Sequence, residues 1–378
     1  MRSGVVRVPL IGAPRDREAR PLLASHDLGS LAALLTRDGA PLSTARSAAA
    51  KALRQAFGRG ADELRWDDAS LTALGVGAWA RPALLALEVA PSLTIADEAP
   101  AEDDTVRLAL RARDGALVET VIIPGPNRTT VCVSSQVGCA RACSFCETGR
   151  HGLSRQLEAG EIIDQVRVAR AAWLGRGGTP TISNLVFMGM GEPMDNLDEV
   201  ARAIRLLTEP RAFAFAPSRV TVSTVGVADK LPLFFASCHA ELAVSLNAPD
   251  DERRARIMPI NERVPMAALR AALLDHLPGG RRVLFEYVLF DHVNDDPADA
   301  DLLSAWISGI RCRVNVIPCN PGPDPALRPP SPERLEAFVA RLSSLGVTTL
   351  VRRPRGRDVG GACGQLAGAL RATIEGPG

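Results

Sequence analysis

Aromatic residues and lysine are both scarce in this chain of 378 residues. Aromatic side chains make up 4% of it, with a single tyrosine, so platforms on which RNA bases could stack are few. Of the 44 basic residues only Lys51 and Lys230 are lysines, and 43 acidic residues leave a net charge of +1. Such a chain has no overall positive field to attract nucleic acid, although a local basic groove on it could still bind RNA.

Long apolar runs are also absent from the sequence. No uninterrupted apolar stretch reaches the roughly 18 residues that a membrane-spanning helix needs, and no signal peptide opens the chain. Hydrophobic residues at 46% and charged residues at 23% are ordinary values, which excludes a disordered or fibrous protein. Four of the eight cysteines fall within fifteen residues, too close together for a disulfide framework. We therefore expect no membrane association and a reducing cytoplasmic location, where clustered cysteines indicate metal binding or catalysis.

The pattern of residues predicts an α/β protein with two domains. Residues 1–104 are predicted to form a small helical accessory domain that ends in an acidic, proline-containing linker or exposed loop over residues 97–104. Residues 105–378 begin with a β region over 105–133 and continue with strands that alternate with helices. The predicted strands are 182–188, 220–225, 242–246, 283–289, 314–317 and 348–351, and the predicted helices are 22–35, 43–57, several within 66–87, 159–174, 196–208, 229–236, 264–277, 297–309 and 332–345. This alternation is typical of a parallel sheet, either open or curled into a partial barrel.

The strongest motif is a cluster of cysteines. Cys139, Cys143 and Cys146 follow the spacing C-x₃-C-x₂-C. Three thiolates this close in one loop can hold three irons of a [4Fe–4S] cluster and leave the fourth iron open to a small molecule. The alternative is a structural zinc site with Cys132 as the fourth ligand, but zinc sites usually pair their cysteines in two knuckles and this segment has only one. The spacing therefore favours an iron–sulfur cluster.

This motif, with Phe145 before its last cysteine, resembles that of the radical S-adenosylmethionine (SAM) enzymes. Further motifs are similar to those of one group among them, the RlmN-type methyltransferases that modify carbon 2 of adenine in RNA. They lie in the family's order at residues 130–139 (TVCVSSQVGC), 187–193 (FMGMGEP), 257–261 (IMPIN), 290–295 (FDHVND) and 362–368 (ACGQLAG). The resemblance runs from about residue 117 to residue 370 and implies a partial, TIM-like (β/α) barrel.

The resemblance also implies the cofactors and the residues that bind them. Cys139, Cys143 and Cys146 would hold a [4Fe–4S] cluster, and SAM would bind at its open iron. Gly191 and Glu192 match residues that contact the SAM amino group; glycine lets a ligand approach the backbone, and a carboxylate can pair with an ammonium group. The other SAM contacts implied by the resemblance are Ser223, Ser245, Leu246, Asn247 and Asn320.

The chemistry of the target atom indicates a role for two cysteines outside the motif, Cys132 and Cys363. Carbon 2 of adenine is flanked by two ring nitrogens and is electron-poor, so a methyl group must reach it as a carbon radical. The resemblance implies that Cys363 accepts a methyl group from one SAM and that a second SAM is cleaved to activate it, two per turnover. Cys132 would then resolve the covalent protein–RNA adduct through a transient disulfide with Cys363. Glu119 matches the family's proton acceptor, and either Glu119 or Cys132 could remove the adenine proton.

The sequence thus predicts a radical SAM methyltransferase that modifies an adenine, at carbon 2, in ribosomal RNA, tRNA or both. One alternative is a carbon-8 adenine methyltransferase of the related Cfr type, which shares the cysteine set. Another is a zinc-stabilised RNA-binding protein without catalysis. The expected partners are the RNA substrate and an electron donor such as flavodoxin or ferredoxin, and we expect a monomer.

Two segments depart from the family pattern. Asn247 stands where the family has a histidine, and an amide can hydrogen-bond SAM but cannot carry a proton. In the accessory domain, residues 41–46 (PLSTAR) replace a Pro-Phe-Arg-x-x-Gln stretch, so we expect the RNA-docking part to be altered. The arginine clusters at 253–256 and 352–357 are candidate phosphate contacts, and the alternative for the first is a solvated charged face.

Overall fold

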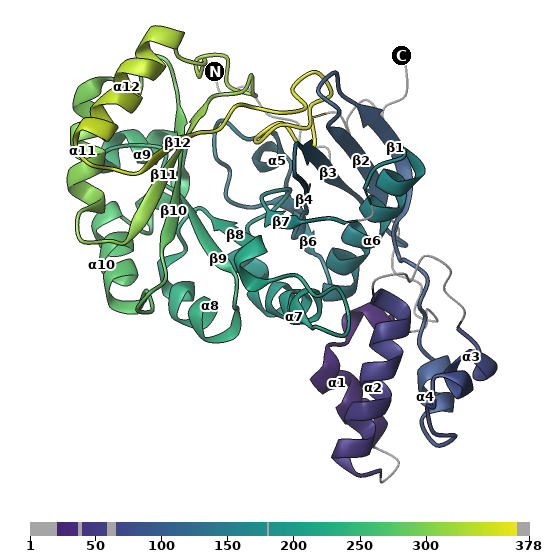
Figure 1. Ribbon diagram of the computed structural model, residues 1–378. Helices are drawn as coiled ribbons and strands as arrows, with labels where there is room; N and C mark the ends of the chain where they lie inside the picture. Colours follow the sequence, from purple (N-terminus) through teal and green to yellow (C-terminus); the bar gives the residue numbers. More distant parts are fainter. Residues whose placement is uncertain (1–20, 37–39, 59–65, 180, 369–378) are drawn as a thin grey trace.

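A computed structural model describes residues 21–36, 40–58, 66–179 and 181–368 of the chain. Its centre is a ten-stranded mixed sheet with the order β1-β2-β3-β4-β7-β8-β9-β10-β11-β12 (Figure 1). These strands are β1 (Thr94–Pro100), β2 (Val106–Arg111), β3 (Leu117–Gly125), β4 (Arg128–Cys132), β7 (Asn184–Phe187), β8 (Val220–Thr224), β9 (Glu241–Ser245), β10 (Val283–Leu289), β11 (Cys312–Pro318) and β12 (Thr349–Val351). A separate antiparallel pair is formed by β5 (Gln136–Cys139) and β6 (Gly152–Gln156).

From β4 to β12 every pair of neighbouring strands is parallel. Helices connect these strands and lie on the outer side of the curled sheet in Figure 1. They are α6 (Ala159–Gly175), α7 (Leu197–Thr208), α8 (Leu231–Ser237), α9 (Asp251–Ile257), α10 (Met266–His276), α11 (Pro297–Ile307) and α12 (Pro332–Ser344). Because β12 does not return to pair with β4, the sheet stays open, which confirms the predicted partial barrel.

Local sequence signals set many of these boundaries. Helix α12 begins after Ser331, whose hydroxyl accepts the backbone N–H of Arg334, and has Pro332 at its first position. Gly346, just past its end, has a φ of +77°, which glycine adopts without strain. All six strands predicted after the cysteine motif are present. The pattern did not predict β5, β6, α9 or the short helix α5 (Glu147–Arg150).

An antiparallel extension, β1 to β3, precedes the parallel strands. The prediction of a linker or exposed loop over residues 97–104 is wrong for residues 97–100, because β1 pairs with β2 from Thr94 opposite Arg111 to Pro100 opposite Val106. Residues 101–104 form the turn between these two strands. Strands β2 and β3 pair next, and β4 joins the extension to the barrel. The domain boundary at residue 104 stays a prediction, and β1 lies on the N-terminal side of it but within the central sheet.

Within the described residues, four α-helices form the N-terminal helical unit, drawn below the sheet in Figure 1. They are α1 (Leu28–Leu35), α2 (Leu42–Phe57), α3 (Asp68–Ala73) and α4 (Arg81–Leu85). An ion pair of 2.6 Å joins Asp27 at the start of α1 to Arg205 on α7, and Phe57 at the end of α2 stacks on Phe213 after α7 with ring centroids 5.5 Å apart. These contacts attach the helical unit to the core. Among the described residues, no helix has both the length and the apolar character needed to cross a membrane.

Candidate active site

A cavity opens at the carboxyl ends of the parallel strands, where their loops meet. Ten of the thirteen residues predicted for the site line it: Cys139, Cys143, Cys146, Gly191, Glu192, Ser223, Ser245, Asn247, Asn320 and Cys363. Glu119, Cys132 and Leu246 do not line this cavity. The side chain of Leu246 is instead fully buried in the hydrophobic core.

The three cysteines of the motif lie in one loop between β5 and α5. Cys139 is the last residue of β5, and Cys146 precedes the first residue of α5. Burial raises the pKa of the Cys143 thiol, and the neighbouring Cys146 and Cys139 raise it further. Cys132 lies outside the cavity that these thiols share. The arrangement therefore differs from the zinc alternative, in which Cys132 is the fourth ligand.

Two further motifs hold the cysteine loop in place. The backbone N–H of Ser144 donates to the carbonyl oxygen of Ile257 at 3.0 Å. The Phe145 ring packs on Phe290, with ring centroids 5.5 Å apart. The segments 257–261 and 290–295 thus support the loop that carries the cysteines.

The turn after β7 needs its glycines for close backbone contact. A Cβ on Gly189 would lie 2.8 Å from Ser134 and Val133, and one on Gly191 would lie 2.6 Å from Gln136. Gly191 also has a φ of +103°, in the region that only glycine adopts readily. Because the turn has this conformation, Glu192 lies in the wall of the cavity and is only 2% exposed.

Three buried acceptor groups face the cavity. The Glu192 carboxylate accepts the backbone N–H groups of Met194 at 2.9 Å and Val225 at 2.8 Å, and burial raises its pKa to about 7. Glu286 Oε1 on β10 and Asn320 Oδ1 after β11 are buried and have no hydrogen-bond partner among the described residues. Sequence reasoning missed Glu286; the available signal was a carboxylate in an otherwise apolar strand. An unpaired buried acceptor is costly, so these atoms favour a ligand rich in hydrogen-bond donors.

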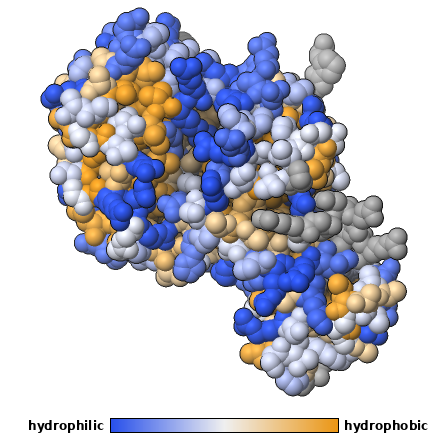
Figure 2. Space-filling view, in the orientation of Figure 1, coloured by the Kyte–Doolittle hydropathy of each residue, from blue (hydrophilic) through white to orange (hydrophobic). Residues whose placement is uncertain are grey.

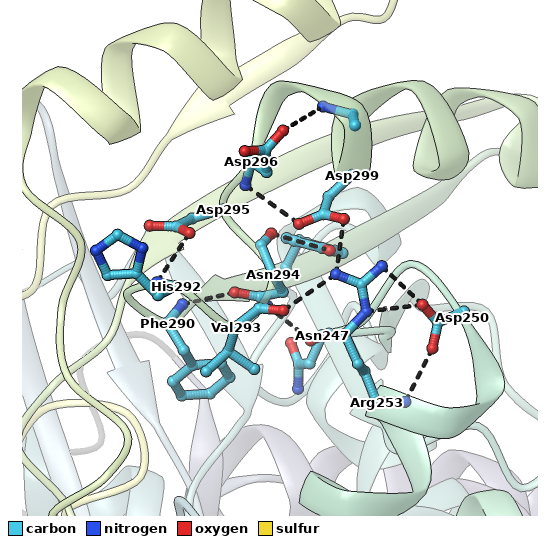
Figure 3. Close-up of polar contacts among 12 residues, drawn as sticks. Asn247, Asp250, Arg253, Phe290, His292, Val293, Asn294, Asp295, Asp296 and Asp299 are labelled. Carbon is cyan, nitrogen blue, oxygen red and sulfur yellow. Dashed lines mark hydrogen bonds and ion pairs between the residues drawn. The ribbon is translucent and has the colours of Figure 1, made fainter.

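Asn247 adopts a φ of +57°, a left-handed conformation that Asn tolerates better than most residues. Its side-chain oxygen accepts the Val288 N–H at 2.9 Å, and its carbonyl oxygen accepts from Asn294 at 2.8 Å. Figure 3 shows Asn294 between Asn247 and Phe290, and its side-chain oxygen also accepts the Phe290 N–H at 2.7 Å. The segment 290–295 thus fixes the loop that places Asn247 in the cavity wall.

Cys363 lies between the main cavity and a smaller one. Both cavities are lined by Cys363 and Arg352, and the smaller one also by Cys132. Cys132 is buried at the end of β4, and burial together with the nearby Cys363 raises its pKa to about 12. The Asn320 amide donates to the Cys363 carbonyl oxygen at 3.0 Å. The fold therefore brings the two predicted catalytic cysteines together from distant parts of the chain.

Glu119 lies in the interior of β3 and lines neither cavity. One carboxylate oxygen pairs with Arg107 at 2.6 Å, and the other accepts the backbone N–H of Ala367, in the segment that carries Cys363. Burial raises the pKa of Glu119, and these two donors oppose that shift. Arg107 also donates to the carbonyl oxygen of Val359 at 2.8 Å. In this structure Glu119 holds the Cys363 segment on the sheet.

Two of the three arginines predicted as phosphate contacts at residues 253–256 are bound within the protein, whereas Arg256 is exposed and pairs with Glu252. Arg253 pairs with Asp250 and Asp299, each at 2.7 Å, as Figure 3 shows. Arg254 is fully buried, and its guanidinium donates to the carbonyl oxygen of Val225 at 2.6 Å. The guanidinium groups of Arg253 and Arg254 therefore stabilise the fold, and only Arg256 of this cluster faces solvent.

The second arginine cluster, residues 352–357, is also partly used within the protein. Arg355 pairs with Asp103 at 2.6 Å, and Arg352 faces the two cavities. Arg353 is exposed. No phosphate role is shown for this cluster.

Comparison with known proteins assigns the family. Residues 133–303 match the model of the Radical SAM superfamily. A protein of Sorangium cellulosum named "Probable RNA methyltransferase" is 68% identical over 98% of this chain and 95% of its own length. The "Dual-specificity RNA methyltransferase RlmN" of Syntrophobacter fumaroxidans is 46% identical over 73% of this chain and 80% of its own.

A solved structure agrees with these relatives. The crystal structure of a radical SAM methyltransferase from Sphaerobacter thermophilus superimposes with a TM-score of 0.80 and 39% identity, covering 92% of this chain and 99% of that one. The similarity extends well beyond the cysteine loop and includes the curled sheet around the cavity. The chain belongs to the radical SAM RNA methyltransferases of the RlmN family.

Proposed function

We propose that this enzyme methylates carbon 2 of an adenine in ribosomal RNA or tRNA through a methyl-cysteine intermediate on Cys363. The observation that carries the proposal is the position of Cys363, which lines the cavity of the cysteine loop on one side and shares a small cavity with Cys132 on the other. From this position the Cys363 thiol can accept a methyl group from a donor in the main cavity and can later react with the Cys132 thiol.

Residues of the cavity fit a cluster and SAM. Cys139, Cys143 and Cys146 would each bind one iron, because a cubane takes each cysteine at a separate metal atom. The Glu192 carboxylate and the unpaired oxygens of Glu286 and Asn320 would accept hydrogen bonds from the donor groups of SAM. When bound, the cluster and SAM supply a methyl group and a carbon-centred radical, with two SAM per turnover. An electron donor such as flavodoxin or ferredoxin would reduce the cluster, and the protein would act as a monomer.

The two cysteines would act on opposite sides of the radical step. The Cys363 sulfur accepts a methyl group and later bonds through that carbon to the base. Cys132 then attacks the Cys363 sulfur and forms a disulfide, and the electron pair of the broken sulfur–carbon bond stays on the carbon, which takes up a proton to become the methyl group. The hydrogen on carbon 2 of the base would leave as a proton, and the one remaining electron would return to the oxidised cluster. Cys132 faces the cavity that contains Cys363, whereas both Glu119 oxygens are held by Arg107 and Ala367. The geometry therefore supports Cys132, and not Glu119, as the residue that contacts the modified adenine.

Two alanine variants test this division of roles. Cys363→Ala should give neither methylated protein nor an RNA adduct. Cys132→Ala should be methylated on Cys363 and accumulate RNA bound covalently to protein, detectable as a nuclease-sensitive mass shift. The absence of any adduct on folded, cluster-containing Cys132→Ala with a methylatable RNA would contradict the two-cysteine mechanism.

Mass spectrometry of nucleosides tests the target atom. RNA from a deletion strain should lack 2-methyladenosine and regain it on complementation. Loss of 8-methyladenosine instead would identify the Cfr-type reaction.

A further inference from the structure

A basic groove lies between α2 and the turn after α3, away from the cavity of the cysteines. Its volume is about 620 Å³, far more than the roughly 30 Å³ of one water molecule. The residues that define this α2 groove are Ser43, Arg46, Lys51, Arg54, Leu74 and Arg211. In Figure 2 hydrophilic residues gather where the helical unit meets the core.

The stripe of basic residues follows from the helical repeat of α2. Ser43, Arg46, Lys51 and Arg54 stand at positions i, i+3, i+8 and i+11, which share one face of a helix. The opposite face is buried and consists mainly of alanine, with Leu53 and Phe57. Packing of the apolar face against the protein therefore turns the basic stripe outward.

No described residue neutralises the charges of the α2 groove. Over the described residues, the guanidinium groups of Arg46, Arg54 and Arg211 have no ion-pair or hydrogen-bond partner, and no carboxylate lines the groove. Lys51 donates to the carbonyl oxygen of Gly75 at 2.7 Å and keeps its charge. An ordinary solvated face mixes both signs, whereas four cations in one groove favour an anionic ligand.

Two structural units contribute to the groove, and contacts fix them together. Arg211 comes from the loop between α7 and β8, and the other residues come from the helical unit. The Phe57–Phe213 stack joins α2 to the loop of Arg211, and the Asp27–Arg205 pair joins α1 to α7. The four cations are therefore presented together by a connected surface.

We infer that the α2 groove binds the phosphodiester backbone of the RNA substrate, an inference that rests on the proposed function. Arginine and serine are common phosphate contacts, and such contacts position a nucleic acid without reading its sequence. This mode of docking suits a chain with few aromatic residues, because it needs no base stacking.

The position of the groove restricts the substrate further. Arg211 precedes β8, whereas Ser223 in the cavity wall lies near the end of the same strand. The groove and the cavity thus lie toward opposite ends of β8, which at five residues is about 17 Å long. An RNA that occupies both must extend at least this far from the target base for its backbone to reach the α2 groove.

A triple variant tests the inference. Arg46→Gln, Arg54→Gln and Arg211→Gln together remove three charges from the groove. Binding is measured by fluorescence anisotropy with a full-length unmodified tRNA transcript over a range of salt concentrations. The slope of log K against log salt should become shallower by about 2 to 3, since each lost phosphate contact contributes about 0.7 to 0.9.

The matched control removes three other exposed arginines, Arg263, Arg282 and Arg313, which also have no ion pair among the described residues. It changes the net charge equally and should keep the wild-type slope. A short hairpin that contains only the target loop should bind to wild type and triple variant alike, because it does not reach the groove.

The outcomes separate this inference from the proposed function. An unchanged salt slope in the triple variant, or an equal loss in the control, would overturn the α2 groove as an RNA site. Wild-type protein that neither binds nor methylates RNA would instead overturn the proposed function. Unchanged methylation of Cys363 by SAM without RNA, together with an unchanged melting temperature, shows that the triple variant is folded.

Discussion

The backbone N–H of Glu147 donates a 2.8 Å hydrogen bond to the carbonyl oxygen of Gly364. Glu147 directly follows Cys146, and Gly364 directly follows Cys363, so this bond joins the cysteine loop to the segment of the proposed methyl acceptor. A second bond runs beside it, from the Thr148 hydroxyl to the carbonyl oxygen of Leu366 at 2.9 Å. The position of Cys363 is therefore set by the same loop that would hold the cluster.

Thr148→Val should slow methylation of Cys363 without loss of the cluster. Valine has nearly the same shape, but it leaves the Leu366 carbonyl without this donor, at a cost of about 1–3 kcal/mol. The initial rate of Cys363 methylation, measured by peptide mass spectrometry, should fall while iron content stays constant. Thr208→Val is the control, because it removes a similar bond to the Ile204 carbonyl at 2.8 Å on α7. Iron loss in parallel with the rate would contradict the prediction.

Arg107→Met should free the Cys363 segment from the sheet. It removes the partner of Glu119 and of the Val359 carbonyl, and breaking a buried pair from one side costs about 3–5 kcal/mol. Disulfide formation between Cys132 and Cys363 with diamide should become slower, and Arg107→Lys should restore part of the rate.

Arg155→Met provides the comparison for this variant. Arg155 also bridges two carboxylates, Asp114 at 2.6 Å and Glu161 at 2.8 Å, but it does not contact the Cys363 segment. It should lower stability and leave the rate of disulfide formation unchanged. Equal slowing in both variants would show that the effect is loss of stability alone.

Gly191→Ala should destabilise the protein more than Gly309→Ala. Both glycines have positive φ, +103° and +81°, so each alanine is strained by about 1–2 kcal/mol. A Cβ on Gly309 meets no atom within 4 Å, whereas one on Gly191 meets Gln136, which adds about 1–3 kcal/mol of overpacking. Urea unfolding should resolve the difference, and SAM binding should fall only in Gly191→Ala, since Gln136 also accepts the Glu192 N–H. Equal losses of stability would exclude the steric explanation.

Cys132 should resist alkylation near neutral pH. Burial and the nearby Cys363 raise the pKa of Cys132 to about 12, and Arg352 opposes this shift. At pH 8 only about one thiol in 10⁴ is therefore ionised. Because the thiolate is the reactive form, labelling by iodoacetamide should accelerate about tenfold for each pH unit up to that pKa. Peptide mapping between pH 8 and pH 10 measures this slope, with urea-unfolded protein as the fully reactive reference. Rapid labelling of Cys132 in folded protein at pH 8 would disagree with its burial.

Signals within short stretches of the sequence were sufficient to predict much of the fold of this protein. The cysteine spacing, the glycine turn before Glu192 and the alternation of helices with strands each depend on neighbouring residues. Ser331, Pro332 and Gly346 delimit α12 in the same way. Such signals act over a few residues and determined the fold class and the cysteine loop, whereas most other residues of the cavity were implied by the resemblance to a known family.

Only the tertiary structure decided which distant groups meet. It paired β1 with β2 where an acidic linker was predicted, buried Arg254, and joined Glu119 to the segment of Cys363. Whether an arginine is a surface charge or a core hydrogen-bond donor depends on the elements packed against it, which composition does not reveal. The tertiary structure also decided that Arg211 lies beside the basic residues of α2, because these residues come from two parts of the chain that fold against each other.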